Sequence, residues 1–198
     1  MNYDSFSDLV LCAICFAIAY RSLSCWPQRS GIAIAMILIG IAAGIGVLRF
    51  SSWDSISDFW TRPHQFASTL AAVGGFPILA FSLVYPKSPL ALRPSGAWWL
   101  CFVVSGFGMG VWMLGFRAWS QIAPLLSWLC ITATVIYARR WQETFGAILI
   151  LCGFLSTLVI QDDFRWFEVF SKVQILHYLL AMGLFVLCGS KVNALDTG

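Results

Sequence analysis

The sequence predicts an all-α, polytopic transmembrane helical bundle, and three observations lead to this fold class. The 198-residue chain is 60% hydrophobic and 11% charged, with a mean hydropathy of +0.82, whereas a soluble domain is about 45–50% apolar and about 25% charged. Several apolar runs approach the roughly 20 residues that a helix needs to cross a bilayer. The alternating pattern of a membrane β-barrel is absent.

We predict a single domain over residues 1–198 with seven membrane spans. The fourth and fifth spans are divided at a tight turn, residues 117–120, because one helix over 97–138 would be about twice as long as the bilayer is thick. Six spans remain if the short first run lies on the membrane surface. The predicted spans are 7–23, 31–50, 66–85, 97–116, 119–138, 143–160 and 171–189.

The charged residues predict an orientation in the membrane. Two acids and no basic side chain precede the first apolar run, which is the reverse of a cleavable signal peptide. With seven spans, the basic residues favour an N-terminus outside and a cytoplasmic C-terminus in the plasma (bacterial inner) membrane. The cytoplasmic set is Arg21, Arg29, Lys87, Arg93, Arg139, Arg140 and Lys191, and the outer set is Arg49, Arg62, Arg117, Arg165 and Lys172.

The distribution of charge and glycine bears on partners. The net charge of +3 comes from scattered basic residues, so the chain lacks the clustered basic face of a nucleic-acid-binding protein. Membrane lipids are the expected surroundings. The run Gly40–Gly44 and the set Gly106, Gly108 and Gly110 have the small-residue spacing of close helix packing, within the chain or against a protein partner.

Two polar stretches approach the membrane from the same, outer face. The first is RFSSWDSISDFWTRPHQF, residues 49–66, which we interpret as a loop followed by a helix with Pro63 at its first position. The second is QDDFRWFEVFSKVQILHY, residues 161–178. Each stretch holds one of the two histidines of the chain. A functional site is therefore expected where these stretches meet.

His177 is the strongest candidate for a catalytic residue. It lies about one turn inside the last span, and Gln174 and Tyr178 share its helical face. Polar groups inside a span usually face the bundle interior or a watery cavity, where they bind substrates or carry protons. Gln174 and Tyr178 would then bind substrate. The alternative is a histidine that hydrogen-bonds a neighbouring helix.

The remaining candidates come from the first stretch and from the start of the second. Arg49 either reaches lipid phosphates or clamps an anionic substrate. His64 is either an interfacial histidine or a metal ligand, and Ser68 lies one turn beyond it. If His64 and His177 converge, a carboxylate could complete a two-histidine zinc site. The candidate carboxylates, also possible catalytic groups, are Asp162 and Asp163.

Cys12 and Cys15 form a CxxC pair in the first span, which raises a thiol-redox function. A reactive thiol needs nearby positive charge or a helix N-terminus, and Asp8 lies one turn before Cys12. The alternative is that both cysteines pack as small apolar residues.

Seven spans, a histidine at the entry of an early span and the polar pair His177-Tyr178 in the last span resemble one broad group of proteins. These are the seven-helix membrane hydrolases of the alkaline ceramidase and progestin-receptor type. The resemblance implies zinc-assisted cleavage of a lipid amide, with His64 and His177 as two ligands and Ser68 as the serine. Ala181 stands where that family has a second histidine in the last helix.

These observations leave three classes of function open. The first is a membrane protein with an outward-facing polar pocket for a lipid or small molecule, of which a metal-assisted hydrolase is one form. The second is a non-enzymatic membrane subunit or scaffold that packs through its glycine-rich helix faces. The third is a membrane thiol-redox protein that uses Cys12 and Cys15.

Overall fold

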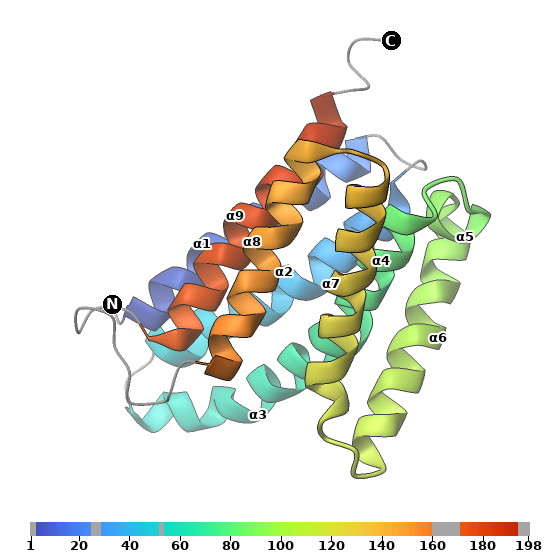
Figure 1. Ribbon diagram of the computed structural model, residues 1–198. Helices are drawn as coiled ribbons and strands as arrows, with labels where there is room; N and C mark the ends of the chain where they lie inside the picture. The colour runs from blue at the N-terminus through green and yellow to red at the C-terminus, as the bar shows by residue number, and fades with distance from the viewer. Residues whose placement is uncertain (1–2, 25–28, 52–53, 160–170, 194–198) are drawn as a thin grey trace.

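The computed structural model describes residues 3–24, 29–51, 54–159 and 171–193, and this part of the chain is helical without any strand. The all-α prediction is therefore confirmed, and Figure 1 shows the helices packed as a bundle. The elements are α1 (Tyr3–Ser24), α2 (Ser30–Ser51), α3 (Asp54–Leu70), the π-helical turn η1 (Ala71–Gly75), α4 (Phe76–Val84), α5 (Pro89–Leu92), α6 (Pro94–Met113), α7 (Trp119–Tyr137), α8 (Trp141–Val159) and α9 (Lys172–Asn193).

Among the described residues, five helical segments are long and apolar enough to cross a membrane, as expected of an integral membrane protein. The first of them, Asp4–Ser24, is 21 residues long, so the prediction that the first run is short does not hold. An apolar helix over Lys172–Cys188 is shorter. The other four segments are Ser30–Ser51, Asp58–Val84, Pro94–Met113 and Trp119–Tyr137.

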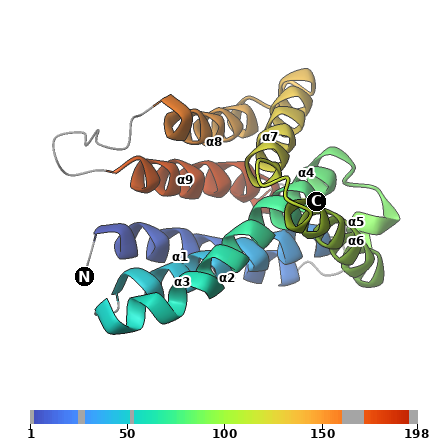
Figure 2. The ribbon, with the colours of Figure 1, turned by 90° about the horizontal axis from the view of Figure 1, so that it is seen from below.

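The first and last helices lie side by side and run in the same direction. α1 packs against α2 and α9, and α8 packs against the other side of α9. Figures 1 and 2 show α1, α8 and α9 on one side of the bundle and α6 on the opposite side. Contacts between α1 and α9 begin in the first turns of both helices. The polar ends of two helices that are far apart in sequence are thereby brought together.

The loop predicted for residues 49–66 is wrong, because all described residues of this stretch are helical. α3 begins at Asp54 and contains Pro63 in its interior. The sequence interpretation placed the helix start at Pro63 because the preceding residues are polar. Those residues instead form a polar extension of the helix, on which Asp58, Phe59 and Arg62 are exposed, as in an amphipathic helix at a surface.

A π-helical turn joins α3 to α4 into one long helical segment. Pro77 has no N–H to donate to the carbonyl four residues earlier, that of Val73, and the backbone widens at this position. α6 covers the turn closely. A Cβ on Gly108 would lie 2.8 Å from the Val73 oxygen, and one on Gly74 would overlap Ser105 Oγ. Gly74 and Gly108 therefore permit the close approach of α6.

The predicted break between the fourth and fifth spans is confirmed. α6 ends at Met113 and α7 begins at Trp119, with Gly115 at a φ of +101° between them. Glycine adopts this left-handed conformation without the steric clash that a Cβ would cause. The turn begins three residues earlier than Arg117, because the helix already ends in the glycine-containing segment.

The predicted small-residue packing is confirmed at some glycines and not at others. A Cβ on Gly40 would lie 3.2 Å from Cys15 Cβ, and one on Gly44 would lie 3.4 Å from Cys12 Sγ, so both glycines face α1. In contrast, no atom of the described part of the chain lies within 4 Å of such a Cβ on Gly106 or Gly110. The α1–α2 contact thus uses its glycines, whereas part of the α6 glycine face is open.

Candidate functional site between α1 and α9

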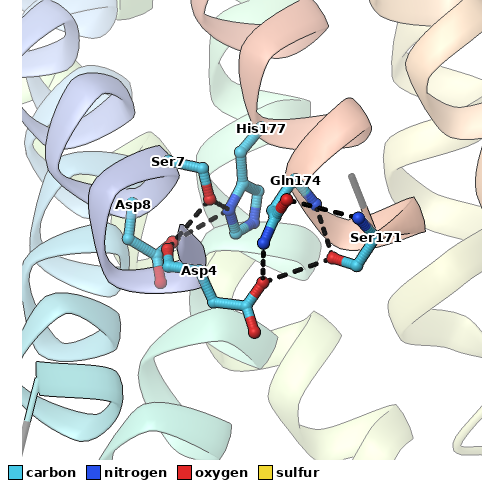
Figure 3. A network of polar contacts seen from close by, with 6 residues as sticks. All are labelled: Asp4, Ser7, Asp8, Ser171, Gln174 and His177. Carbon is cyan, nitrogen blue, oxygen red and sulfur yellow. Dashed lines mark hydrogen bonds and ion pairs between the residues drawn. The ribbon is translucent and has the colours of Figure 1, made fainter. Parts of the chain in front are cut away.

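A hydrogen-bonded pair of Asp8 from α1 and His177 from α9 forms the centre of the candidate site. Asp8 is 1% exposed, and its Oδ1 lies 3.0 Å from His177 Nδ1. Figure 3 shows both side chains between the two helices. A carboxylate buried in an apolar bundle needs a hydrogen-bond partner, and His177 provides one for Oδ1.

The neighbouring Ser7 determines which nitrogen of His177 carries the hydrogen. The Ser7 hydroxyl donates to the backbone oxygen of Asp4 at 2.9 Å, so only its lone pairs are available to His177 Nδ1, 3.4 Å away. An ionised carboxylate is also an acceptor only. Nδ1 therefore carries the hydrogen, and in the neutral ring Nε2 is a hydrogen-bond acceptor.

The first turn of α9 is fixed by a capping box that also binds α1. The Gln174 N–H donates to Ser171 Oγ at 3.3 Å, and the Ser171 N–H donates to Gln174 Oε1 at 3.2 Å. Such a reciprocal pair satisfies two N–H groups at a helix start. Both side chains then donate to Asp4 Oδ1, at 3.2 Å from Ser171 and 2.5 Å from Gln174, as Figure 3 shows.

A small cavity of about 160 Å³ lies beside the Asp8–His177 pair. Its polar lining comes from α1, α3 and α9, which contribute Asp8, His64, Ser68 and His177. The rest of the described lining is apolar: Leu11, Ile39, Ala42, Ala43, Ala71, Phe76, Phe154, Leu176 and Leu180. A mostly apolar cavity with a small number of polar groups is typical of a small-molecule binding site.

Among the described residues, two buried polar atoms of side chains that line this cavity have no hydrogen-bond partner, Asp8 Oδ2 and His64 Nδ1. Both side chains lie beside Gly46 of α2. A Cβ at Gly46 would overlap Asp8 Oδ2 and would lie 3.1 Å from His64 Cε1. The glycine therefore leaves room for a carboxylate oxygen and a histidine ring to approach the same point.

The structure brings three of the sequence-predicted residues to one cavity: His64, Ser68 and His177. The described lining does not include Arg49, Gln174 or Tyr178. The Arg49 guanidinium lies 4.9 Å from the centre of the Phe50 ring, and Phe50 in turn meets His64 edge-on, with ring centres 5.8 Å apart. The amide of Gln174 is engaged in the capping box, so its role is structural here.

The described residues contain only part of the predicted zinc site, His64 and His177. No group of three His, Cys, Asp or Glu side chains in the described part of the chain could hold a metal ion. Of the described donors, His177 Nδ1 is engaged by Asp8 Oδ1. The predicted carboxylates Asp162 and Asp163 lie outside the described residues, so their part of the prediction stays a prediction.

The cysteines of the CxxC pair lie in the α1–α2 packing. Cys15 is fully buried, Cys12 is half-buried, and both are free thiols. Their contacts with Gly40 and Gly44 are those of small apolar side chains. This arrangement favours packing over redox chemistry.

Sequence reasoning missed the contribution of α1 to the site. Asp4 and Asp8 are four residues apart and therefore share one helical face, and Asp8 lies at the start of an apolar run. A carboxylate in a membrane-spanning segment signals a functional or paired position. That signal was present, but nothing in the sequence placed His177, 169 positions later, beside it.

Comparisons with known proteins identified no similar protein. No protein-family model, no curated protein and no solved structure matches the chain.

Proposed function

We propose that this chain is a multi-pass membrane protein that binds a lipid or small molecule in the α1–α3–α9 cavity and hydrolyses it. The observation that carries the proposal is the hydrogen bond between Asp8 and His177 at the wall of a cavity that also holds His64 and Ser68. A histidine oriented by a buried carboxylate is a recurrent general base of hydrolytic enzymes.

The chemistry follows from the assigned tautomer. Asp8 holds the Nδ1–H of His177, so Nε2 can accept a proton from a water molecule. The water oxygen attacks the carbonyl carbon of a bound ester or amide, and the same proton is then given to the leaving oxygen or nitrogen as its bond to carbon breaks. Ser68 and His64 would hydrogen-bond the substrate. Asp8 would stabilise the imidazolium that forms between these steps.

We further propose the seven-span topology with the N-terminus outside. Its support is the seven-to-five division of basic residues and the parallel direction of α1 and α9 (Figure 1). The site lies near the first turns of both helices. In this orientation the cavity is close to the outer leaflet, within reach of a lipid headgroup or an external molecule.

The test uses purified protein in lipid vesicles and a panel of fluorogenic lipid esters and amides. We expect turnover that falls about 10²–10⁴-fold in His177→Ala, the usual contribution of a general base. Met182→Ala is the matched control, because Met182 is on the same helix but exposed. Absence of turnover by the unmutated protein, or full activity of His177→Ala, would refute hydrolysis.

The resemblance to the seven-helix hydrolases would add a zinc ion to this proposal, which the described donor set does not support. Metal analysis of the purified protein provides the check, together with thermal unfolding before and after chelation. We expect no stoichiometric metal and an unchanged unfolding temperature. Bound zinc that stabilises the fold would favour the resemblance over the metal-free mechanism.

A non-enzymatic scaffold is the second candidate, and the open part of α6 favours it. Gly106 and Gly110 form a G-x-x-x-G spacing with nothing within 4 Å of either added Cβ, and their neighbours Phe102, Val103 and Phe107 are exposed. Such a face suits close contact with another transmembrane helix. A Gly106→Leu variant that lost a co-purifying protein while retaining its fold would support this function.

A further inference from the structure

We propose that the cavity recognises a primary ammonium group, from a free amine or an aminolipid headgroup. This inference rests on the proposed function, because it names the ligand class of the same cavity. It is argued from Asp8 Oδ2 and His64 Nδ1, which are buried and without a partner among the described residues, on two side chains that both meet Gly46. Any ligand at this point must satisfy both atoms, since burying them alone costs free energy.

Both atoms are hydrogen-bond acceptors. The carboxylate of Asp8 has no hydrogen to donate. The His64 ring lies at the backbone of Ala42, and we assign the ring hydrogen to Nε2, toward that carbonyl, because Nδ1 has no partner among the described residues. In the neutral ring Nδ1 is then an acceptor. The ligand must therefore supply at least two hydrogen-bond donors that converge on neighbouring atoms.

The ligand should also be cationic. Asp8 is the acidic group of the described lining, and that lining contains no lysine or arginine. An anionic group such as phosphate placed beside Asp8 would meet its carboxylate with no lysine or arginine in the described lining to offset the repulsion. A primary ammonium offers one positive charge and three N–H donors. These match Asp8 Oδ2, His64 Nδ1 and the hydroxyl of Ser68, which lines the same cavity.

The position of Arg49 is compatible with both sources of the ammonium. Arg49 lies over Phe50, which contacts His64, so its guanidinium is next to the cavity lining without belonging to it. A zwitterionic headgroup could place its ammonium at Asp8 and its phosphate at Arg49. A free amine would use the cavity alone. The two sources share the ammonium chemistry and differ in their need for Arg49.

The first experiment measures thermal unfolding of the purified full chain in detergent, in an amine-free phosphate buffer, with methylammonium or tetramethylammonium. Both probes carry one positive charge, but tetramethylammonium has no N–H donor. We expect methylammonium to raise the unfolding temperature in a saturable manner and tetramethylammonium to leave it unchanged. Equal shifts from both probes, or none from methylammonium, would overturn the proposal.

Three variants test the named atoms. We expect Asp8→Asn to weaken methylammonium binding at least tenfold, since it removes the charge. His64→Phe, which removes the second acceptor, should weaken it to a smaller degree. Gly46→Ala should abolish binding because its methyl would occupy the space between Asp8 and His64. If Gly46→Ala does not fold, the affinities of Asp8→Asn and His64→Phe for methylammonium provide the test. Unchanged affinity in both would refute the site.

Gly106→Ala is the control for the glycine variant, since no atom lies near its added methyl. We expect it to bind methylammonium normally. If it loses binding as Gly46→Ala does, the loss is not specific to the cavity and the proposed site is wrong.

The second experiment distinguishes the sources. Vesicles of phosphatidylethanolamine and of phosphatidylcholine present headgroups of equal charge, but the second has a quaternary nitrogen without N–H. If only phosphatidylethanolamine competes with methylammonium, and Arg49→Gln weakens this competition, the ligand is an aminolipid. If neither lipid competes, it is a free amine. Equal competition by both lipids would contradict recognition through N–H donors. Binding without hydrolysis would refute the proposed reaction and leave this inference standing.

Discussion

The α1–α9 contact and the outer face of α6 use polar and small residues in opposite ways. At the α1–α9 contact, Asp8 and Gln174 are buried and hydrogen-bonded across the two helices. On α6, Gly106 and Gly110 leave a gap in a face of exposed aromatic residues. The comparison teaches that residue type alone does not reveal packing. A glycine or an aspartate is constrained only where the fold places a neighbour against it.

The largest expected effect concerns the α8–α9 contact beside the site. A Cβ on Gly183 of α9 would lie 2.6 Å from the backbone oxygen of Gly146 of α8, and a backbone atom cannot rotate away. We expect Gly183→Ala to lower the free energy of unfolding by about 3 kcal/mol, as overpacking does. Denaturant unfolding in micelles, followed by tryptophan fluorescence, measures this. A neutral effect would mean that α8 and α9 are farther apart.

The second prediction removes the central carboxylate. Asp8→Ala leaves the Nδ1–H of His177 without its 3.0 Å partner, and an unsatisfied buried donor costs about 1–3 kcal/mol. We expect a loss of about 2 kcal/mol in the same unfolding measurement. Asp8→Asn is the control because its side-chain oxygen can still accept the hydrogen bond. Equal losses in both variants would show that charge, rather than the hydrogen bond, stabilises the contact.

The third prediction concerns the capping box. Ser171→Ala removes the acceptor for the Gln174 N–H and one donor to Asp4. We expect a loss of about 1 kcal/mol, which is typical for an N-cap residue. Ser120→Ala at the α6–α7 turn, where the hydroxyl donates to the carbonyl of Arg117, should change stability by less than about 0.5 kcal/mol. A reversed order would contradict the importance of this cap.

The smallest effect is expected on the open face of α6. Gly106→Ala adds a methyl where no atom lies within 4 Å, and alanine has the higher helix propensity. We therefore expect stability to rise by about 0.5 kcal/mol. A clear destabilisation in the same assay would reveal a partner, such as a second copy of the chain, that contacts this face.

The helical architecture was readable from the sequence because it depends on local composition. Long apolar runs predicted the helices, and the turn between α6 and α7 followed from the length of one run. The error at residues 49–66 has a local cause as well, since Pro63 was taken as a helix start although α3 continues through it. The seven-span topology stays a prediction.

The site was only partly readable, because it depends on contacts between distant segments. Intramembrane polarity singled out His177, and the expectation of a site where the two histidine-bearing stretches meet agrees with His64 and His177 lining one cavity. Asp8 was considered as an N-terminal acid and for its effect on Cys12, but not as a residue of the site. Its pairing with His177 depends on α1 lying beside α9, which no local pattern specifies. Gln174 was interpreted as a substrate ligand because the partner of its amide, Asp4, is likewise distant in sequence.

The pairing of the first helix with the last has a consequence for how the chain is made. α1 carries two carboxylates whose α9 partners are synthesised about 170 residues later. Until then, in the proposed membrane setting, Asp4 and Asp8 lack these partners, and an unpaired carboxylate in a bilayer is costly. We therefore expect α1 to reach its final position in the membrane late in biogenesis, only after α9 has been synthesised. Chains truncated before α9 should be recognised and degraded by membrane proteases.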